Sequence, residues 1–130
     1  LCRRAGLCRA APPRRACRMT RAVFVLDLEN DPELISAYEA RHTPGSVWPE
    51  VIRAIRQRGY RDMEIWRVAD RLVMLAEIVP SGLAPFDPDL QPIVAQWEAE
   101  MDAYQRPIAP NGPKWLPMTR IFALGEHPAP

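Results

Sequence analysis

The chain has 130 residues and a formal net charge of +1, but its charge is unevenly distributed. Residues 1–18 hold six arginines, all three cysteines and no acidic residue, which leaves 11 basic and 16 acidic residues from Met19 onward, a net charge of −5. This cysteine-free body excludes a disulfide framework and a Cys-based zinc site, and its acidity disfavours nucleic-acid binding. No apolar run approaches the roughly 18 residues of a membrane-spanning helix.

The first 18 residues differ from the body in composition. They contain Pro12-Pro13 but no serine and no amphipathic period, unlike an organellar transit peptide, and they lack the apolar core of a secretory signal. Met19 is the first methionine, and a strand-like run follows it at once. We therefore expect residues 1–18 to be a disordered basic leader outside the native coding sequence, followed by one cytoplasmic domain over 19–126 and a tail over 127–130.

The first half of the body predicts a strand and a helix broken in two. Residues 21–28 (RAVFVLDL) favour a strand, and Asn30-Asp31-Pro32 then supplies a helix cap with proline at the first helical position. One face of the helix that follows carries Leu34, Ile35, Tyr38 and His42. Thr43-Pro44-Gly45-Ser46 ends it. Ser46 is expected to cap a second helix with apolar residues at i, i+3, i+4 and i+7, and Gly59 to close it.

The next segments predict a hairpin and a helix. Residues 62–68 and 71–79, joined by Ala69-Asp70, have the spacing of a tight antiparallel hairpin. After a loop bearing Pro and Gly, Asp87 or Asp89 is expected to cap a helix. Its nearly continuous apolar stripe consists of Leu90, Ile93, Val94, Trp97, Met101 and Tyr104.

The last part of the chain completes the expected topology. A proline-rich stretch, 106–114, precedes an alternating run, 115–124, that is predicted to be the final strand. The order β-α-β-β-α-β fits a ferredoxin-like α+β sandwich of the dimeric α/β-barrel type, with a four-stranded antiparallel sheet and helices on one face. The open face of the sheet needs a cover, which a second subunit commonly supplies, so we expect a homodimer.

His42 is the candidate for acid–base chemistry. The other histidine, His127, lies close to the chain end, whereas His42 follows Tyr38 by four residues and precedes the Pro44-Gly45 break. Side chains four residues apart are neighbours on a helix. A structural role is the alternative, because the helix dipole favours histidine at a helix C-terminus.

The segment from Tyr38 to Glu50, YEARHTPGSVWPE, resembles the Y-x-x-x-H…W-P-E signature of the L-rhamnose mutarotase family, dimeric ferredoxin-like sugar-ring epimerases. The resemblance extends from Arg21 to about Leu124. It includes the runs 71–75 (RLVML) and 96–101 (QWEAEM), which match a strand and the last helix of the family. It implies an enzyme that opens the sugar hemiacetal by proton transfer through His42, with Tyr38 bound to a sugar hydroxyl. Since acid–base groups suffice for this reaction, we expect no metal and no cofactor.

Departures from the family pattern bear on the sugar. Rhamnose-type members carry a tyrosine where this chain has Met63, and a tryptophan pair where it has Trp97-Glu98. The pattern from Trp97 through Tyr104-Gln105 to Lys114-Trp115 resembles the branch associated with L-fucose breakdown. The resemblance therefore favours L-fucose over L-rhamnose, with Trp97 stacked on the apolar face of the sugar and Glu98 bound to its hydroxyls.

Structural roles stand beside these assignments. Trp97 is also a position of the apolar stripe, so burial alone explains it, and Glu98 and Lys114 are explained by solvation. Two other functions fit the same architecture: a non-catalytic dimeric domain that binds a ligand in a pocket lined by Tyr38, His42 and Trp97, and a cofactor-free monooxygenase. Accelerated exchange between sugar anomers would separate the mutarotase from both.

Overall fold

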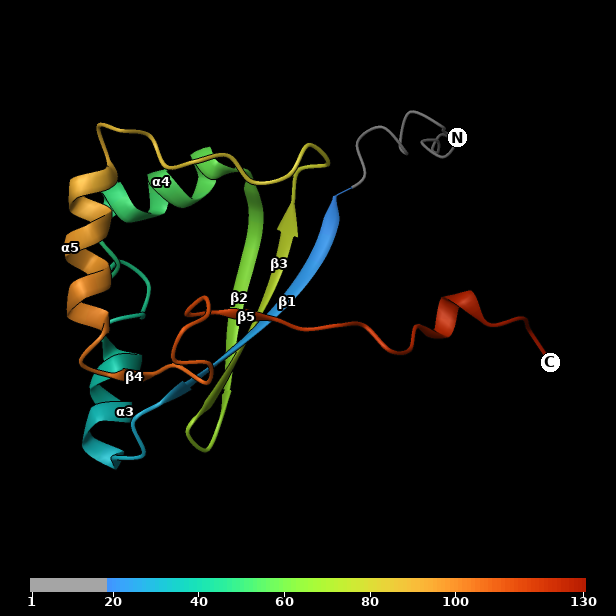
Figure 1. The fold of residues 1–130 in the computed structure, drawn as a ribbon, viewed down its shortest axis with the longest axis horizontal. Helices are drawn as coiled ribbons and strands as arrows, with labels where there is room; N and C mark the ends of the chain where they lie inside the picture. Colours follow the sequence, from blue (N-terminus) through green and yellow to red (C-terminus); the bar gives the residue numbers. More distant parts are fainter. Residues whose placement is uncertain (1–18) are drawn as a thin grey trace.

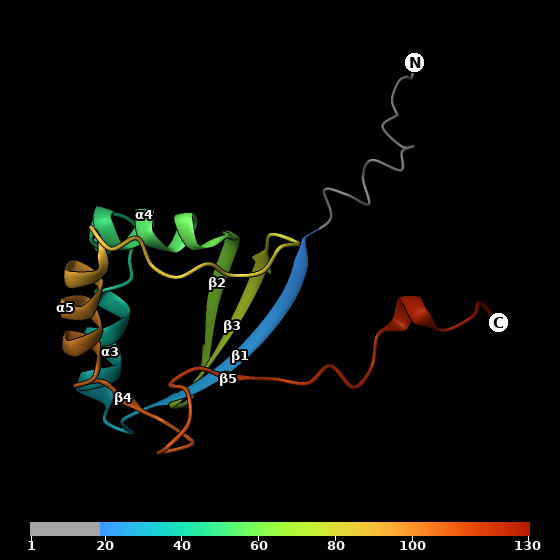
Figure 2. The ribbon, with the colours of Figure 1, turned by 45° about the horizontal axis from the view of Figure 1, so that its top comes forward.

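The computed structural model describes residues 19–130, so the expectation of a disordered leader concerns residues outside the described part. Three helices lie together on one side of a curled antiparallel sheet (Figures 1 and 2). In chain order the elements are β1 (Thr20–Leu28), α3 (Pro32–Ala40), α4 (Pro49–Arg58), β2 (Tyr60–Val68), β3 (Arg71–Ile78), α5 (Gln91–Met101), β4 (Gln105–Arg106), β5 (Leu116–Pro117) and a short 3-10 helix (Leu124–Glu126).

The strand order β2-β3-β1-β4 confirms the ferredoxin-like topology. β1 and β3 are antiparallel neighbours, with Phe24 opposite Met74, and β3 pairs on its other side with β2, where Ile65 is opposite Met74. The predicted hairpin is present, because Ala69 and Asp70 form the two-residue turn and Ala69 adopts a positive φ of 52°. Residues at alternate positions therefore face the helices, which is how the sheet contributes one wall of the site.

The final strand differs from the expectation over 115–124. The free edge of β1 pairs with two short pieces, β4 opposite Asp27 and Leu28, and β5 opposite Phe24 and Val25. Beyond Met118, whose amide donates to Val23 O over 2.7 Å, the chain leaves the sheet and runs outward (Figure 1). Alternating apolar residues form a strand only where a partner strand is available, and residues 119–124 have none within residues 19–130.

Two of the predicted helix ends are confirmed. Asp31 caps α3, since its carboxylate accepts hydrogen bonds from Glu33 N over 2.9 Å and Leu34 N over 3.4 Å. Gly59 closes α4 with a φ of 117°. A Cβ at this glycine would lie 2.8 Å from Val79 Cγ2, so both the backbone conformation and the close approach of Val79, the residue after β3, require glycine here.

The two other predicted caps are wrong. α4 begins after Trp48 without a side-chain cap, because the Ser46 hydroxyl is engaged within the loop at 2.7 Å from Thr43 Oγ1. α5 begins after Leu90, also uncapped, and the Asp87 carboxylate instead accepts from Asp89 N in the turn before the helix. The segments that precede α4 and α5 are short turns in which these polar side chains form hydrogen bonds within the turn instead of capping the helix.

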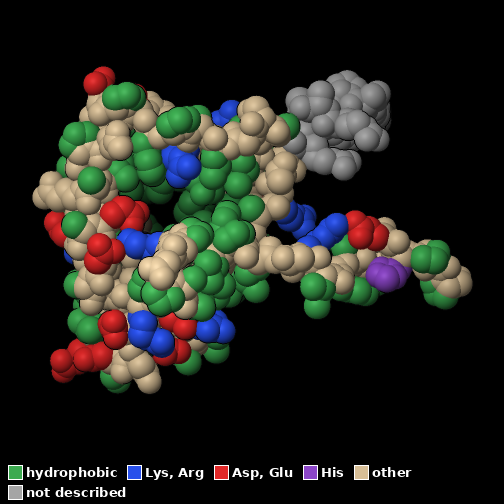
Figure 3. Space-filling view, in the orientation of Figure 1, with side chains coloured by type: hydrophobic (Ala, Val, Ile, Leu, Met, Phe, Trp, Pro, Cys, Tyr) green, Lys and Arg blue, Asp and Glu red, His purple; other side chains and the backbone are tan. Residues whose placement is uncertain are grey.

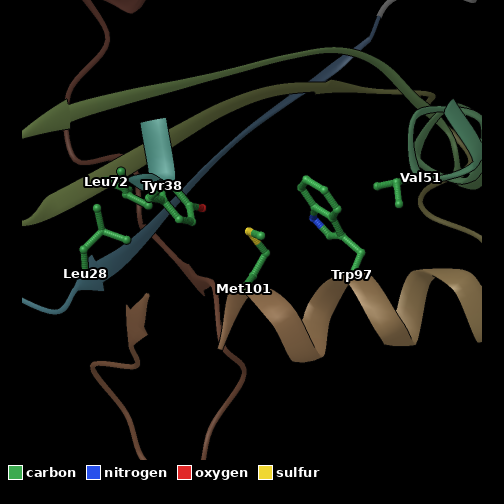
Figure 4. Close-up of a cluster of buried hydrophobic side chains, with 6 residues drawn as sticks. All are labelled: Leu28, Tyr38, Val51, Leu72, Trp97 and Met101. Carbon is green, nitrogen blue, oxygen red and sulfur yellow. The ribbon is translucent and has the colours of Figure 1, made fainter. Parts of the chain in front are cut away.

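The main core lies between the three helices and the inner face of the sheet (Figure 4). It consists of Leu28, Tyr38, Val51, Leu72, Trp97 and Met101. The predicted stripe of α5 is confirmed, since Leu90, Val94, Trp97 and Met101 are buried. Within residues 19–130, no helix has the length and apolar character needed to cross a membrane.

Candidate active site

Tyr38 and His42 lie one turn apart at the C-terminal end of α3, as their spacing predicts. Their ring centroids are 4.3 Å apart with planes inclined by 35°. Tyr38 is buried, whereas His42 is half-buried just where the helix ends. The loop that follows is held in place by Thr43, whose hydroxyl donates to Ala40 O over 3.1 Å, and it turns at Gly45 with a φ of 87°.

The hydrogen bonding of His42 fixes the role of each ring nitrogen. Nδ1 lies 2.8 Å from Tyr38 O, and because a carbonyl oxygen only accepts, Nδ1 carries the proton. In the neutral ring Nε2 therefore bears a lone pair. Burial lowers the pKa of His42 below its ordinary value of 6.5, the positive charge of Arg41 lowers it further, and the bond to Tyr38 O opposes both. At neutral pH the side chain is thus an uncharged base.

Trp97 projects from α5 toward the same space. Its ring meets Trp48 edge-on at 5.1 Å and His42 at 5.8 Å. The guanidinium of Arg41 lies 4.9 Å from the ring centroid of Trp97 and donates to Glu100 over 2.9 Å, which ties α3 to α5. Trp97 is only 5% exposed, so it is part of the core as well as a neighbour of His42.

A cavity of about 240 Å³ lies between the helices and the sheet, among these side chains. Its lining includes Tyr38, His42, Met63, Trp97, Glu98, Gln105 and Trp115. The structure therefore brings all four sequence-predicted site residues, Tyr38, His42, Trp97 and Glu98, to one cavity. Figure 3 shows the molecule hollowed between the helices and the sheet, and in Figure 4 Tyr38 and Trp97 lie on either side of Met101. The volume is slightly below the range of about 300–1,000 Å³ common for small-molecule sites.

His42 lies at the boundary between this cavity and an open groove along α4. The groove has a volume of about 1,260 Å³, and His42, Val47 and Ile52 line both spaces. The groove is larger, but it contains neither Tyr38 nor Trp97, so the smaller cavity is the better candidate for the reaction. The groove gives His42 access to solvent, with which it can exchange a proton.

Glu98 is more constrained than the sequence indicates. Lys114 Nζ lies 2.7 Å from Glu98 Oε1 and 2.7 Å from Asp102 Oδ1. Lys114 is therefore not the solvated lysine expected from the sequence. Lys114 lies in the loop between β4 and β5, and its ion pairs hold that loop against α5. Burial is the largest single influence on the pKa of Lys114, and it lowers that pKa. The hydrogen bonds and charges of Asp102 and Glu98 together outweigh burial, so the pKa of Lys114 is raised. Glu98 keeps about half of its side-chain surface exposed at the cavity mouth.

Gln105 was not selected as a site residue from the sequence. It is the first residue of β4, opposite Leu28, and its Nε2 donates to the Tyr38 hydroxyl over 3.2 Å. Burial raises the pKa of Tyr38, so its hydroxyl stays protonated at neutral pH. The sequence contained two signals for Gln105: its place in the pattern that resembles the L-fucose branch, and its position four residues after Met101, in line with the apolar stripe. Within residues 19–130, no cluster of three His, Cys, Asp or Glu side chains is arranged to hold a metal ion.

Comparisons with known proteins agree on one family. The L-rhamnose mutarotase family matches residues 21–124. An L-fucose mutarotase from Xanthomonas campestris pv. campestris is 41% identical over 114 residues, covering 83% of this chain and 90% of the relative. An L-rhamnose mutarotase from Cronobacter sakazakii is 29% identical over 103 residues, covering 78% and 91%. The crystal structure of an L-rhamnose mutarotase from Formosa agariphila superimposes with a TM-score of 0.59 at 20% identity, over 81% of this chain and 98% of that one.

Proposed function

Because the chain belongs to the L-rhamnose mutarotase family, we propose that it interconverts the α and β anomers of a 6-deoxy-L-hexose, with L-fucose preferred over L-rhamnose. It is an isomerase that acts on carbohydrates. The preference for L-fucose is supported by the 41% identity to an L-fucose mutarotase, compared with 29% to an L-rhamnose mutarotase. The observation that carries the proposal is the neutral His42 beside Tyr38 in a cavity of about 240 Å³.

The reaction requires two proton transfers and no net change in composition. The neutral Nε2 of His42 accepts the proton of the anomeric hydroxyl, solvent supplies a proton to the ring oxygen, and the bond between the anomeric carbon and the ring oxygen breaks. The aldehyde group of the open chain rotates, so that the ring hydroxyl attacks its other face. The ring closes as both proton transfers reverse. The protonated Tyr38 hydroxyl can donate a hydrogen bond to a sugar oxygen throughout.

The remaining site residues are assigned to substrate binding. Trp97 supplies an apolar wall for the deoxyhexose and its methyl group, together with Met63 and Trp115 of the same cavity. Glu98, at the cavity mouth, is assigned to accept a hydrogen bond from a sugar hydroxyl while it remains paired with Lys114. These roles rest on their positions in the cavity and on the resemblance of the chain to its family.

Anomeric exchange measured by NMR on three sugars tests this function. The protein should accelerate exchange of L-fucose most, L-rhamnose less and D-galactose least, because D-galactose has the mirror-image ring configuration of L-fucose and a hydroxymethyl group in place of the methyl group. Heat-denatured protein is the control for buffer catalysis. Sugar binding without accelerated exchange would instead support a non-catalytic ligand-binding domain, and equal rates for L-fucose and L-rhamnose would contradict the sugar preference.

We further propose that the protein acts as a homodimer joined through the outer face of the sheet. This face carries apolar side chains of three adjacent strands: Val25 on β1, Val73 and Leu75 on β3, and Trp66 on β2. The side chain of Trp66 is 62% exposed. An exposed apolar surface of this kind is typical of subunit interfaces. The outward-running segment after β5 adds Ile121, which is 94% exposed.

A charge placed on this face tests the dimer. Light scattering at micromolar concentration should give twice the monomer mass for the parent and the monomer mass for Trp66→Glu, since a buried unpaired carboxylate opposes association. Glu77→Gln, on the neighbouring strand β3, is the control for a mild change in charge. A monomeric parent would contradict the proposal.

A further inference from the structure

We propose that Gln105 holds a hydroxyl group of the sugar and helps to select L-fucose over L-rhamnose. This inference rests on the proposed function and assigns a substrate-binding residue within the same cavity. Gln105 is 7% exposed and lines the cavity together with Tyr38, His42, Trp97 and Glu98. It comes from the edge strand β4, so it reaches the cavity from a different element than the other four.

The hydrogen bonding of Gln105 is incomplete within the described residues. Its Nε2 donates to the Tyr38 hydroxyl over 3.2 Å, whereas its Oε1 is buried and has no partner among residues 19–130. Buried polar atoms are almost always hydrogen-bonded, because an unpaired one loses its interaction with water without a replacement. Exchanging the two amide atoms does not resolve this, since Nε2 would then be the atom left without a partner.

The pair formed by Tyr38 and Gln105 has the chemistry to bind a sugar hydroxyl. Tyr38 accepts from Gln105, which leaves its own O–H free to donate, and Gln105 Oε1 is free to accept. A donor and an acceptor side by side match a carbohydrate, in which each hydroxyl both donates and accepts. Both groups are uncharged at neutral pH, as suits a neutral ligand in a partly apolar cavity.

A directional contact of this kind can separate the two sugars. L-Fucose and L-rhamnose differ in the orientation of their hydroxyls at C2 and C4, whereas the methyl group is common to both. The apolar wall at Trp97 therefore recognises what the sugars share, and a fixed amide can recognise where they differ. A site built to bond a hydroxyl discriminates strongly against a ligand that lacks it at that place, because the buried amide atom is then left unpaired.

The test compares Gln105→Met with the parent. Methionine keeps the length of the side chain but cannot form hydrogen bonds, and Gln96→Met, on the exposed side of α5, is the matched control. We expect Gln105→Met to raise the KM for L-fucose about tenfold with a smaller change in kcat, and to change the KM for L-rhamnose by less than threefold. Gln96→Met should behave as the parent.

Deoxy sugars show whether the contact is direct. The parent should exchange either the 2-deoxy or the 4-deoxy analogue of L-fucose with a KM about tenfold higher than that of L-fucose, and Gln105→Met should remove this penalty for that one analogue. A purely structural support of Tyr38 would leave the penalty in place. Tyr38→Phe is a second comparison, because it removes the bond between the two side chains but leaves the Gln105 amide in the cavity.

Binding of methyl α-L-fucopyranoside, which cannot open its ring, separates this inference from the proposed function. Loss of binding in Gln105→Met but not in Gln96→Met would support the contact even if exchange were slow in every sample. Unchanged KM values for both sugars and unchanged deoxy penalties would overturn it. If Gln105→Met fails to fold, Gln105→Asn, which withdraws the amide by one methylene, should give the same loss of binding. Failure of the proposed function would appear in the parent itself, as no acceleration of any sugar.

Discussion

Replacement of His42 by asparagine should slow enzymatic anomer exchange of L-fucose by about 10²-fold or more. Asparagine keeps a polar N–H that can reach the Tyr38 carbonyl, which His42 Nδ1 contacts at 2.8 Å, but it has no group that titrates near neutrality. The change therefore removes the lone pair of Nε2 while it preserves the local hydrogen bond. It tests proton transfer more directly than alanine does.

The expected loss of rate follows from the removal of one acid–base group, and the expected loss of stability follows from the contacts of His42. General acid–base catalysis by one positioned group contributes about 10²–10⁴-fold, which corresponds to roughly 3–5 kcal/mol of transition-state stabilisation. The stability cost should be near 1 kcal/mol, because the variant loses only the aromatic contacts with Tyr38 at 4.3 Å and Trp97 at 5.8 Å. A large kinetic effect with a small change in the free energy of unfolding would identify a chemical role.

The assay is the exchange rate between the anomeric protons, measured by NMR as a function of protein concentration and pH. Burial lowers the pKa of His42 below 6.5, so the neutral base persists below that pH in the folded protein. The parent rate should hold as the pH falls through about 6.5 and decline only at lower pH. The same shift destabilises the fold in acid, since the unfolded chain binds this proton more readily than the folded chain does.

His127→Asn provides the matched control. His127 is exposed and stacked on Phe122 at 4.8 Å, in the segment that runs away from the cavity, so its replacement should leave the exchange rate and its pH profile unchanged. If His42→Asn exchanged L-fucose anomers at the parent rate, the proton-transfer role of His42 would be refuted. The mechanism would then have to be rebuilt around Glu98 or Lys114.

Three further predictions concern stability. Gly59→Ala should lower the free energy of unfolding by about 2–5 kcal/mol in thermal melts, because alanine is strained in the left-handed backbone and its Cβ would lie 2.8 Å from Val79. Gly45→Ala is the control, since its φ is 87° but the space around it is open, so it should cost only the backbone strain. Arg71→Leu should lower the melting temperature at pH 7, and the loss should shrink below about pH 4. The Arg71 hydrogen bonds hold the pKa of Asp27 below its ordinary value, so their stabilising effect disappears as that carboxylate is protonated. A chain that begins at Met19 should keep the melting temperature and exchange rate of the full chain, and a large loss in either would show that residues 1–18 contribute to the fold.

The local structure follows from the sequence because its signals depend on near neighbours. The cap at Asp31, the left-handed end at Gly59 and the hairpin turn at Ala69-Asp70 each involve residues within a few positions of one another. The four-residue spacing of Tyr38 and His42 likewise sets their contact, since helix geometry alone brings them together. The β-α-β-β-α-β order was sufficient to identify the topology.

Only the tertiary structure decided which distant side chains share the cavity. The pairing of Lys114 with Glu98 and Asp102 and the bond between Gln105 and Tyr38 join residues from separate elements, which no local pattern encodes. The predicted strand over 115–124 was wrong beyond β5 for the same reason. A strand requires a partner as well as an alternating pattern, and the edge of β1 pairs with only two short pieces, Gln105–Arg106 and Leu116–Pro117. That interruption of the edge strand places Gln105 in the cavity and Lys114 against Glu98.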